Sequence, residues 1–271
     1  MNYSLGNMLG RGFVGGLDPD AKGYIDAVTA TGTSVSGTQR VAINNFYKTS
    51  KLSGDYTSLK RLYLPIWASA SANAIDMIGL TSGTFNGSVT HAAGYIQGDG
   101  VTGYFDTLST DTAMGISPLS CSIGVLSFLA PTILGVAIGS QTGATPFSLT
   151  FAASGFNNAA LYLNNSANSV FTQNGVLIAS RTSATANAYY QRKTAGFTTP
   201  VTGVTTSIAG TLANGLKIYG LARSFSNTAN SFTNYRAGAL IIGTGITTAQ
   251  ATSLTLSIKN LWEGATGLTL P

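Results

Sequence analysis

The sequence has little charge: only 8% of its 271 residues are Asp, Glu, Lys or Arg, about a third of the share usual in globular proteins. Disorder is nevertheless excluded, because a disordered chain combines high net charge with few large apolar residues. Here 44% of the residues are hydrophobic, with 12 Phe and 12 Tyr among the aromatics. Gly, Ser, Thr and Asn separate the apolar clusters, as in NNAALYLNNSANS. This pattern predicts many short strands joined by turns around a packed core.

Cysteine and histidine are nearly missing. The single Cys121 excludes an internal disulfide and a cysteine pair for a metal, and its apolar surroundings, SCSIGVLSFLA, predict a buried thiol. His91 is the one histidine. Because the sequence also has no G-x-S-x-G motif, neither a Ser-His hydrolase nor a zinc site is expected. We interpret His91, in VTHAAGY, as a polar residue at a strand edge.

Acidic side chains are missing from a long stretch, because no Asp or Glu lies between Asp111 and Glu263. Glycoside hydrolysis requires two carboxylates about 5–9.5 Å apart, and most of the predicted sheet cannot supply them. We therefore predict that the protein is not an enzyme and has no catalytic residue. Calcium remains an alternative, because Asp99 and Asp106 could supply oxygen ligands. Otherwise no metal or cofactor is expected.

Basic and apolar stretches point away from nucleic acid and membrane. The formal net charge is +5, and the densest basic runs, Lys60-Arg61 and Arg192-Lys193, are too short to follow a phosphate backbone. Residues 122–139 are uncharged, but Pro131 interrupts them, and two buried strands around a turn fit better than a membrane span. The start, MNYSLGNMLGRGFVGG, lacks the pattern of a signal peptide, which predicts synthesis and folding in a cytoplasm.

Residues 1–17 are rich in glycine and show no periodicity. Their apolar side chains are too scattered for the segment to bury itself; they are Leu5, Met8, Leu9, Phe13 and Val14. We therefore predict an extended N-terminal arm that docks on a neighbouring subunit and anchors the protein in an assembly.

A helical segment is predicted over residues 18–61. Asp18 can cap a first helix that has proline at its first position. Ser36 and Gln39 have the spacing of a capping box before a second helix that runs to about Lys51. A short helical turn near residues 56–60 completes the segment.

A C-terminal helix is predicted over residues 247–263. Thr247 and Gln250 again have capping-box spacing, and apolar residues follow at helical intervals up to Gly264. We expect its apolar face to seal one edge of the sheets, with Trp67 and Trp262 as large core residues.

From residue 62 onward, apolar runs alternate with turn residues every eight to twelve positions, as in β-sandwiches. The candidate strands are Leu62–Trp67, Tyr95–Phe105, Ser120–Leu129, Ile133–Ser140, Phe147–Ala152, Ala159–Leu163, Gly175–Arg181, Ala188–Lys193, Gly215–Ser224 and Ala237–Gly243. Their number predicts two packed sheets over residues 62–271, closed by the C-terminal helix.

The order of several segments resembles a known family. These segments are AKGYIDAVTATG, LKRLYLPIW, GYIQGDGVTGYFDT, GVLIASRTSATANAYY, LKIYGLARSFSN and GALIIGTGITTAQATSLTLSIKNLWEGATGL. In this order they resemble bacteriophage and prophage virion proteins that carry a concanavalin A-like, laminin-G-like jelly roll behind a small helical segment. The resemblance implies a mostly β, two-sheet jelly-roll sandwich with N-terminal helices and a C-terminal helix. The same fold also serves carbohydrate-binding modules, and a fold does not fix a function.

The resemblance implies a virion structural protein, made in the host bacterial cytoplasm, that decorates the capsid, forms a head fibre or joins the tail. Its partners would be other virion proteins and copies of itself, because symmetric homo-oligomers are usual for such parts. The sequence departs from the family at residues 188–193, AYYQRK, where relatives often have an Asn-Gly turn.

A glycan- or receptor-binding module of the virion is the alternative, and a polysaccharide-degrading enzyme is a third. Sugar sites use exposed aromatics flanked by amides and arginine on a rigid sheet or its loops. The residues that suit this chemistry are Asn157, Asn158, Tyr189, Tyr190, Gln191 and Arg192.

Overall fold

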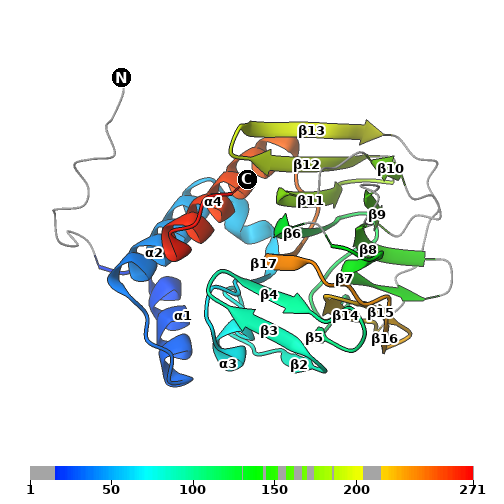
Figure 1. Ribbon diagram of the computed structural model, residues 1–271. Helices are drawn as coiled ribbons and strands as arrows, with labels where there is room; N and C mark the ends of the chain where they lie inside the picture. Colours follow the sequence, from blue (N-terminus) through cyan, green and yellow to red (C-terminus); the bar gives the residue numbers. More distant parts are fainter. Residues whose placement is uncertain are drawn as a thin grey trace.

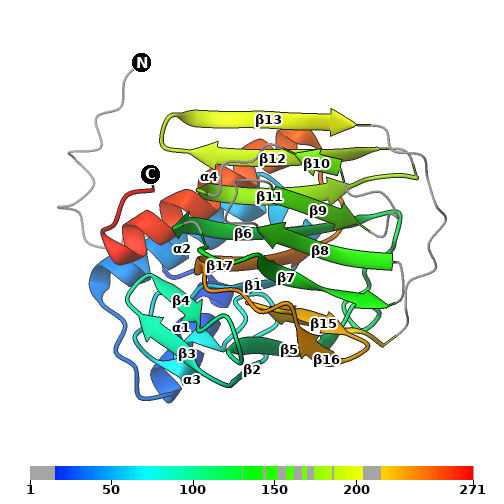
Figure 2. The same ribbon diagram turned by 45° about the vertical axis from the view of Figure 1, so that its right-hand side comes forward.

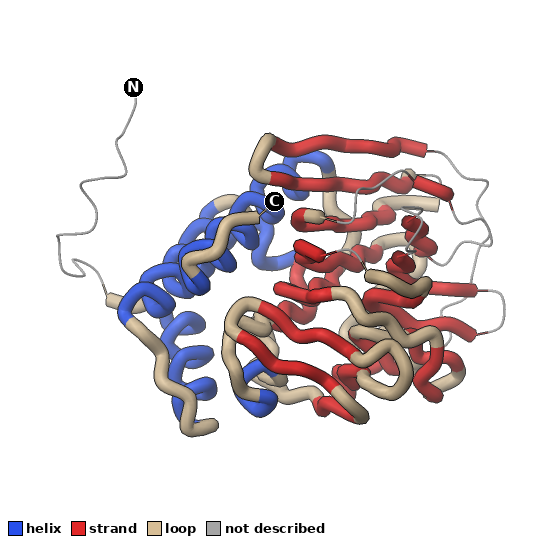
Figure 3. The backbone as a smooth tube through the Cα atoms, viewed as in Figure 1, coloured by secondary structure: helices blue, strands red, loops and turns tan. Residues whose placement is uncertain are grey.

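The computed structural model describes residues 16–129, 131–142, 145–151, 157–161, 167–169, 174–184, 186–203 and 215–270. They form three layers: helices, an eight-stranded sheet and a nine-stranded sheet. Figure 1 shows the helices on the left and the two sheets to their right, and Figure 3 separates helix from strand by colour. The predicted mostly β, two-sheet sandwich with N-terminal helices and a C-terminal helix is therefore confirmed.

The predicted caps form in the N-terminal helices. Helix α1, Pro19–Ala30, begins after Asp18, whose side chain accepts hydrogen bonds from the N–H groups of Asp20 and Ala21. Helix α2, Gly37–Leu52, begins with a complete capping box, and the short 3₁₀ helix η2, Asp55–Ser58, follows it. These caps satisfy N–H groups that have no partner inside the helix, so the local sequence is enough to place each start.

The eight-stranded sheet forms the middle layer, with strand order β13-β12-β11-β6-β17-β4-β3 and β1 paired to β17. Its strands are β1 Leu59–Tyr63, β3 Val89–Ala92, β4 Tyr95–Gly98, β6 Cys121–Leu129, β11 Gly175–Arg181, β12 Asn187–Lys193, β13 Gly196–Gly203 and β17 Arg236–Gly243. Its pairs are antiparallel. Both faces are covered, which explains the nearly continuous apolar run in β17 and β11.

The nine-stranded sheet has the order β10-β9-β8-β7-β14-β5-β2, and the β15–β16 hairpin joins it through β7. Its strands are β2 Thr84–Asn86, β5 Tyr104–Thr110, β7 Gly135–Thr142, β8 Thr145–Phe151, β9 Asn157–Leu161, β10 Ala167–Ser169, β14 Lys217–Gly220, β15 Arg223–Phe225 and β16 Thr228–Asn230. Figure 2 shows these strands in front of the eight-stranded sheet. One face packs inward, and the other, here called the outer face, is turned away from the helices.

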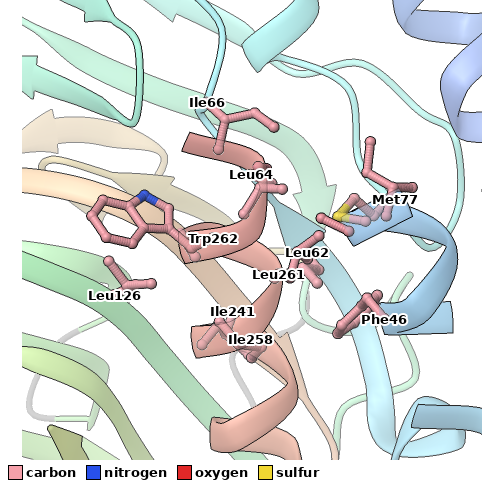
Figure 4. Packing of buried hydrophobic residues seen from close by; sticks show 14 of the residues in the cluster. Phe46, Leu62, Leu64, Ile66, Met77, Leu126, Ile241, Ile258, Leu261 and Trp262 are labelled. Carbon is pink, nitrogen blue, oxygen red and sulfur yellow. The ribbon is translucent and has the colours of Figure 1, made fainter. Parts of the chain in front are cut away.

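Two apolar cores hold the layers together. One lies between the sheets and includes Phe105, Ile138 and Leu240. The other lies between the eight-stranded sheet and the helices, where α4, Thr248–Thr266, packs with α2. Figure 4 shows Trp262 and Ile258 of α4 against Leu126 and Ile241 of the sheet. The predicted roles of Trp67 and Trp262 are confirmed, since they are 3% and 1% exposed.

Several predicted boundaries were wrong. The C-terminal helix continues through Gly264 and ends at Gly267, which has the left-handed conformation typical of a helix end. The run predicted as one strand over residues 95–105 is divided into β4 and β5, because Asp99 binds the N–H groups of a turn between them. The run over residues 215–224 is divided at Leu221, whose φ is 63°. A short helix, α3 Ala70–Asn73, was not predicted.

In the described residues, no helix combines the length and the apolar character needed to cross a bilayer.

Candidate functional site

The residues proposed from sequence as a glycan contact do not form an exposed surface. Tyr189 and Tyr190 are each 2% exposed, Gln191 is 4% and Arg192 is 9% exposed. They lie on β12, whose two faces pack against the second sheet and the helices. From the sequence, the polar stretch over residues 189–192 was predicted to be exposed. It is buried instead, because other layers of the fold cover both faces of β12.

Each of these side chains has a structural partner instead. Arg192 donates from Nε to Thr255 Oγ1 at 3.0 Å and from Nη2 to the Thr252 carbonyl at 2.7 Å, which ties α4 to the sheet. The Tyr190 ring stacks on Phe197, with 6.0 Å between ring centroids. Gln191 donates to the Asn174 carbonyl at 2.7 Å. This stretch is therefore a seam between layers.

Three other groups of predicted residues fall elsewhere. Asn157 and Asn158 lie in β9, and their side chains are outside the described residues. The arm side chains are outside them too; these are Leu5, Met8, Leu9, Phe13 and Val14. The calcium candidates are engaged with protein donors: Asp99 accepts three backbone N–H groups, and Asp106 pairs with Lys217. Among the described residues no group of three or more His, Cys, Asp or Glu could hold a metal ion.

The outer face of the nine-stranded sheet carries a group of polar and aromatic side chains that we call the outer patch. It consists of Tyr104, Asp106, Gln141, Lys217, Tyr219, Arg223, Phe225 and Asn230. Strand register places them together: Tyr219 lies opposite both Asp106 and Gly139, Phe225 opposite Gln141, and Arg223 opposite Asn230. Alternate residues of the same strands, such as Phe105 and Ile138, point into the core between the sheets.

Aromatic rings make one half of the outer patch. The ring of Tyr104 lies 4.9 Å from that of Tyr219, and Phe232, in the loop after the hairpin, lies 6.1 Å from Tyr104. Tyr219 is 3% exposed, and its hydroxyl donates to the Asn227 carbonyl at 3.0 Å. Burial raises the pKa of Tyr219. Tyr104 is half-buried and is the ring of this pair that a ligand can reach.

A fixed arginine makes the other half. Arg223 donates from Nε to Asn230 Oδ1 at 3.0 Å and from Nη1 to Gln141 Oε1. Its guanidinium carbon lies 5.5 Å from the centroid of the Phe225 ring, a distance typical of cation–π contacts. Burial lowers the pKa of Arg223, but a guanidinium keeps its charge at neutral pH.

Lys217 and Asp106 neutralise each other beside the tyrosines. The Lys217 ammonium lies 2.9 Å from Asp106 Oδ2, and this hydrogen bond raises the pKa of Lys217. Asp106 Oδ1 also accepts the Leu108 N–H at 2.7 Å. Asp106 is the one carboxylate in the outer patch, so Arg223 is its unneutralised charge.

The backbone under the outer patch is held rigidly. Ser226 and Asn227 form the two-residue turn of the β15–β16 hairpin with φ of 49° and 65°, the combination required by a type I′ turn. Asn227 then accepts the Lys217 N–H at 2.9 Å and donates to the Gly215 carbonyl at 3.2 Å. Gly139, the partner of Tyr219 on β7, has a φ of 156°, and a side chain there would lie 2.4 Å from Ser148. The hairpin and β14 therefore form one unit.

Sequence reasoning did not select the outer patch, although six of its eight residues lie in two of the segments that carry the family resemblance. GDGVTGYFDT contains Tyr104 and Asp106, and LKIYGLARSFSN contains Lys217, Tyr219 and Arg223. The alternation around Ile218 was a usable signal, because it puts Lys217 and Tyr219 on one face of a strand. The pairing of β14 with β5, about 110 residues away, could not be read from the sequence.

Comparisons with known proteins give a fold likeness at low identity. No family model and no curated protein matches the sequence. Domain 4 of AbnA, a GH43 extracellular arabinanase from Geobacillus stearothermophilus, was solved in complex with arabinotriose. It superposes with a TM-score of 0.47 and 16% identity over 73% of this chain and 98% of that domain. A Trypanosoma rangeli sialidase superposes with a TM-score of 0.46 and 10% identity over 80% of this chain, which spans 39% of the sialidase chain.

Both TM-scores lie below 0.5. A likeness at this level does not transfer a ligand from either protein to this chain.

Proposed function

We propose that the protein is a non-enzymatic glycan-binding module whose binding surface is the outer patch. The observation that carries the proposal is the fixed guanidinium of Arg223, held by Gln141 and Asn230 beside aromatic rings on an open sheet face. A sugar presents hydroxyl groups at its edge and C–H groups on its face. The amides and guanidinium suit the first, and the rings of Tyr104 and Phe225 suit the second.

Rigidity of the site supports binding. When a surface is ordered before the ligand arrives, immobilising its side chains costs less free energy on binding. Here the hairpin turn is bonded to β14, and Arg223 is held in place by two side-chain acceptors. The outer patch therefore needs little rearrangement to present its donors.

Binding without hydrolysis is favoured by the acid–base groups of the outer patch. Glycosidases place two carboxylates on either side of the scissile bond. Asp106 has no second carboxylate in the outer patch, and its oxygens are engaged by Leu108 and Lys217. Its arrangement suits a structural ion pair and not a general acid.

The test is a glycan array probed with the full-length protein, followed by calorimetry on each ligand that is retained. Tyr104→Ala removes the accessible ring and is expected to weaken binding by tenfold or more, about 1.4 kcal/mol. Tyr95→Ala is the matched control, because Tyr95 is also half-buried and lies under an arginine, Arg236, but belongs to the other sheet. An array on which no glycan is retained, with both variants folded, overturns the proposal.

A second function is compatible with the first. The protein would be a structural protein of a phage virion, with a concanavalin A-like jelly roll, and its N-terminal arm would anchor it to the particle. One observation favours it. The described chain begins beside α2, where Lys48 Nζ donates to the Gly16 carbonyl at 3.4 Å, and α2 belongs to the helical layer across both sheets from the outer patch. Gly16 therefore lies on the side of the molecule opposite the outer patch, where Leu52 is 88% exposed.

Deletion of residues 1–15, which keeps Gly16 and the core contact of Leu17, tests this second function. The melting temperature is expected to stay near that of the full chain, while incorporation into purified particles is lost. Equal incorporation of the shortened chain would refute an anchoring arm. A map of the particle would also give the symmetry of the homo-oligomer that we propose.

A further inference from the structure

We propose that the glycan bound by the outer patch is an acidic one, a polymer or terminal residue of a carboxylate-bearing sugar, and that Arg223 recognises the carboxylate. The inference rests on the proposed function and adds the chemical class of the ligand. It comes from the one charge in the outer patch that the protein leaves without a counter-ion.

Arg223 differs from the paired charges elsewhere. Arg61 lies 3.6 Å from Asp76, and Lys217 lies 2.9 Å from Asp106. No ion pair involves Arg223 in the described part of the chain. The sequence has no Asp or Glu from residue 112 to residue 262, so the strands on either side of Arg223 have no acid to offer. A cation in this setting favours an anionic ligand.

The free edge of the guanidinium has the geometry for a carboxylate. Nε is bonded to Asn230 and one N–H of Nη1 to Gln141. Nη2 has no acceptor within the part of the chain that the structure describes. The remaining Nη1 and Nη2 N–H groups form the fork that binds two carboxylate oxygens at once. Because the two amide oxygens hold the arginine, the fork is oriented before the ligand binds.

The other arginines of the sheets do not offer this arrangement. Arg181 is fully buried and donates to the carbonyls of Ser183, Leu161 and Ala184. Arg192 is bonded to α4. These two arginines hold the fold together, and Arg61 of β1 is paired with Asp76. Arg223 and Arg236 are therefore the half-buried arginines of the described strands that have no ion pair.

Arg236 provides the matched control. It is half-buried, its guanidinium carbon lies 4.6 Å from the ring centroid of Tyr95, and its Nε donates to Gln97 Oε1 at 3.2 Å. It therefore has the same kinds of neighbour as Arg223 but lies on β17 of the other sheet. A general effect of net charge would be the same for both arginines.

The experiment measures Kd by calorimetry at 0.15 M salt for trigalacturonate and for the neutral trisaccharide obtained by reducing its carboxylates. The full-length protein is expected to bind the acidic form at least tenfold more tightly. Arg223→Gln should remove this preference, because it should weaken binding of the acidic form much more than binding of the neutral form. Arg223→Lys should retain part of it, because lysine keeps the charge but not the fork. Arg236→Gln should behave like the unmodified protein.

Two results would overturn the inference without touching the proposed function: equal affinity for the acidic and reduced forms, or an acidic preference that survives Arg223→Gln. Loss of the preference in Arg236→Gln as well would show a net-charge effect and would also overturn it. If the protein binds neither trisaccharide and no glycan on the array, the proposed glycan-binding function is itself overturned. Melting curves of every variant establish that each one is folded.

Discussion

Replacing Asp76 with alanine is expected to lower the free energy of unfolding by about 3–5 kcal/mol. The Asp76 side chain is completely buried. Its Oδ1 accepts the N–H groups of Leu62 at 2.8 Å and Ile78 at 3.0 Å, and its Oδ2 accepts that of Gly79 at 2.7 Å. Burial raises the pKa of Asp76, and these bonds together with Arg61 oppose the rise. The carboxylate thus joins β1 to the loop after α3.

The expected loss in the free energy of unfolding is estimated from the three N–H groups that donate to Asp76. Each buried N–H that loses its acceptor costs about 1–2 kcal/mol, which gives roughly 3–6 kcal/mol in total. Removing the carboxylate also removes its own desolvation cost, which lowers that sum. The net loss is a large part of the roughly 5–15 kcal/mol of a typical domain, and in a protein of this size it corresponds to a melting temperature roughly 10 °C lower.

Asp99→Ala is the matched control for this change. Asp99 Oδ1 also accepts three backbone N–H groups, those of Val101, Thr102 and Gly103, but Asp99 is exposed. These bonds and the Thr102 hydroxyl lower the pKa of Asp99. Because water can replace the lost acceptor, the expected loss is about 1 kcal/mol. The assay is urea unfolding at pH 7, followed by tryptophan fluorescence.

Comparing Asp76→Ala with Asp99→Ala distinguishes the effect of burial from the effect of the number of hydrogen bonds lost. The explanation would be refuted if the free energy of unfolding of Asp76→Ala lay within about 1 kcal/mol of that of the unmodified protein. It would also be refuted if Asp76→Ala and Asp99→Ala lost the same amount of stability. Asp76→Asn gives an internal check. Its amide oxygen can still accept from Leu62 and Ile78, while its NH₂ group faces the Gly79 N–H, so the loss should lie between those of the unmodified protein and the alanine variant.

Two further predictions concern single titratable groups. Cys121 is fully buried, and burial raises its pKa to about 12. Iodoacetamide at pH 8 should therefore label Cys121 only when urea has unfolded the protein. Rapid labelling of the native protein would contradict the buried position of Cys121 in β6. Burial lowers the pKa of His91 below its usual 6.5, so the folded state binds its proton less readily than the unfolded state. The stability of the unmodified protein should therefore fall relative to His91→Gln as pH drops below about 6.5, and parallel unfolding free energies from pH 7.5 to 5 would exclude this.

The helices were predictable because their signals are local. A capping residue and its partner three positions on fix a start, whatever the rest of the chain does, and Ser36 with Gln39 and Thr247 with Gln250 form the predicted boxes. The strand content was predictable from apolar runs in the same way. The shortest strands, such as β2 and β16 with three residues each, were missed because three residues carry no readable period.

The candidate site was not predictable, because it depends on which strands are neighbours. Tyr104 and Tyr219 form a ring pair only through the pairing of β5 with β14. The same limit explains the error at Tyr189 and Tyr190. Their sequence context is polar, and only the third layer, formed by helices from both ends of the chain, buries the outward side of β12.

That third layer has a consequence for the order of folding during synthesis. Helix α2 is made early, but its partner α4 is the last helix of the chain, and Ser253 of α4 donates to Asp55 at 2.5 Å across 198 residues. The first strand, β1, pairs with the last, β17. While the ribosome is still translating the middle of the chain, the part of the apolar side of α2 that packs on α4 is uncovered. A chain that stops before α4 therefore keeps that surface exposed to chaperones and proteases, and only chains that include β17 and α4 can close the molecule.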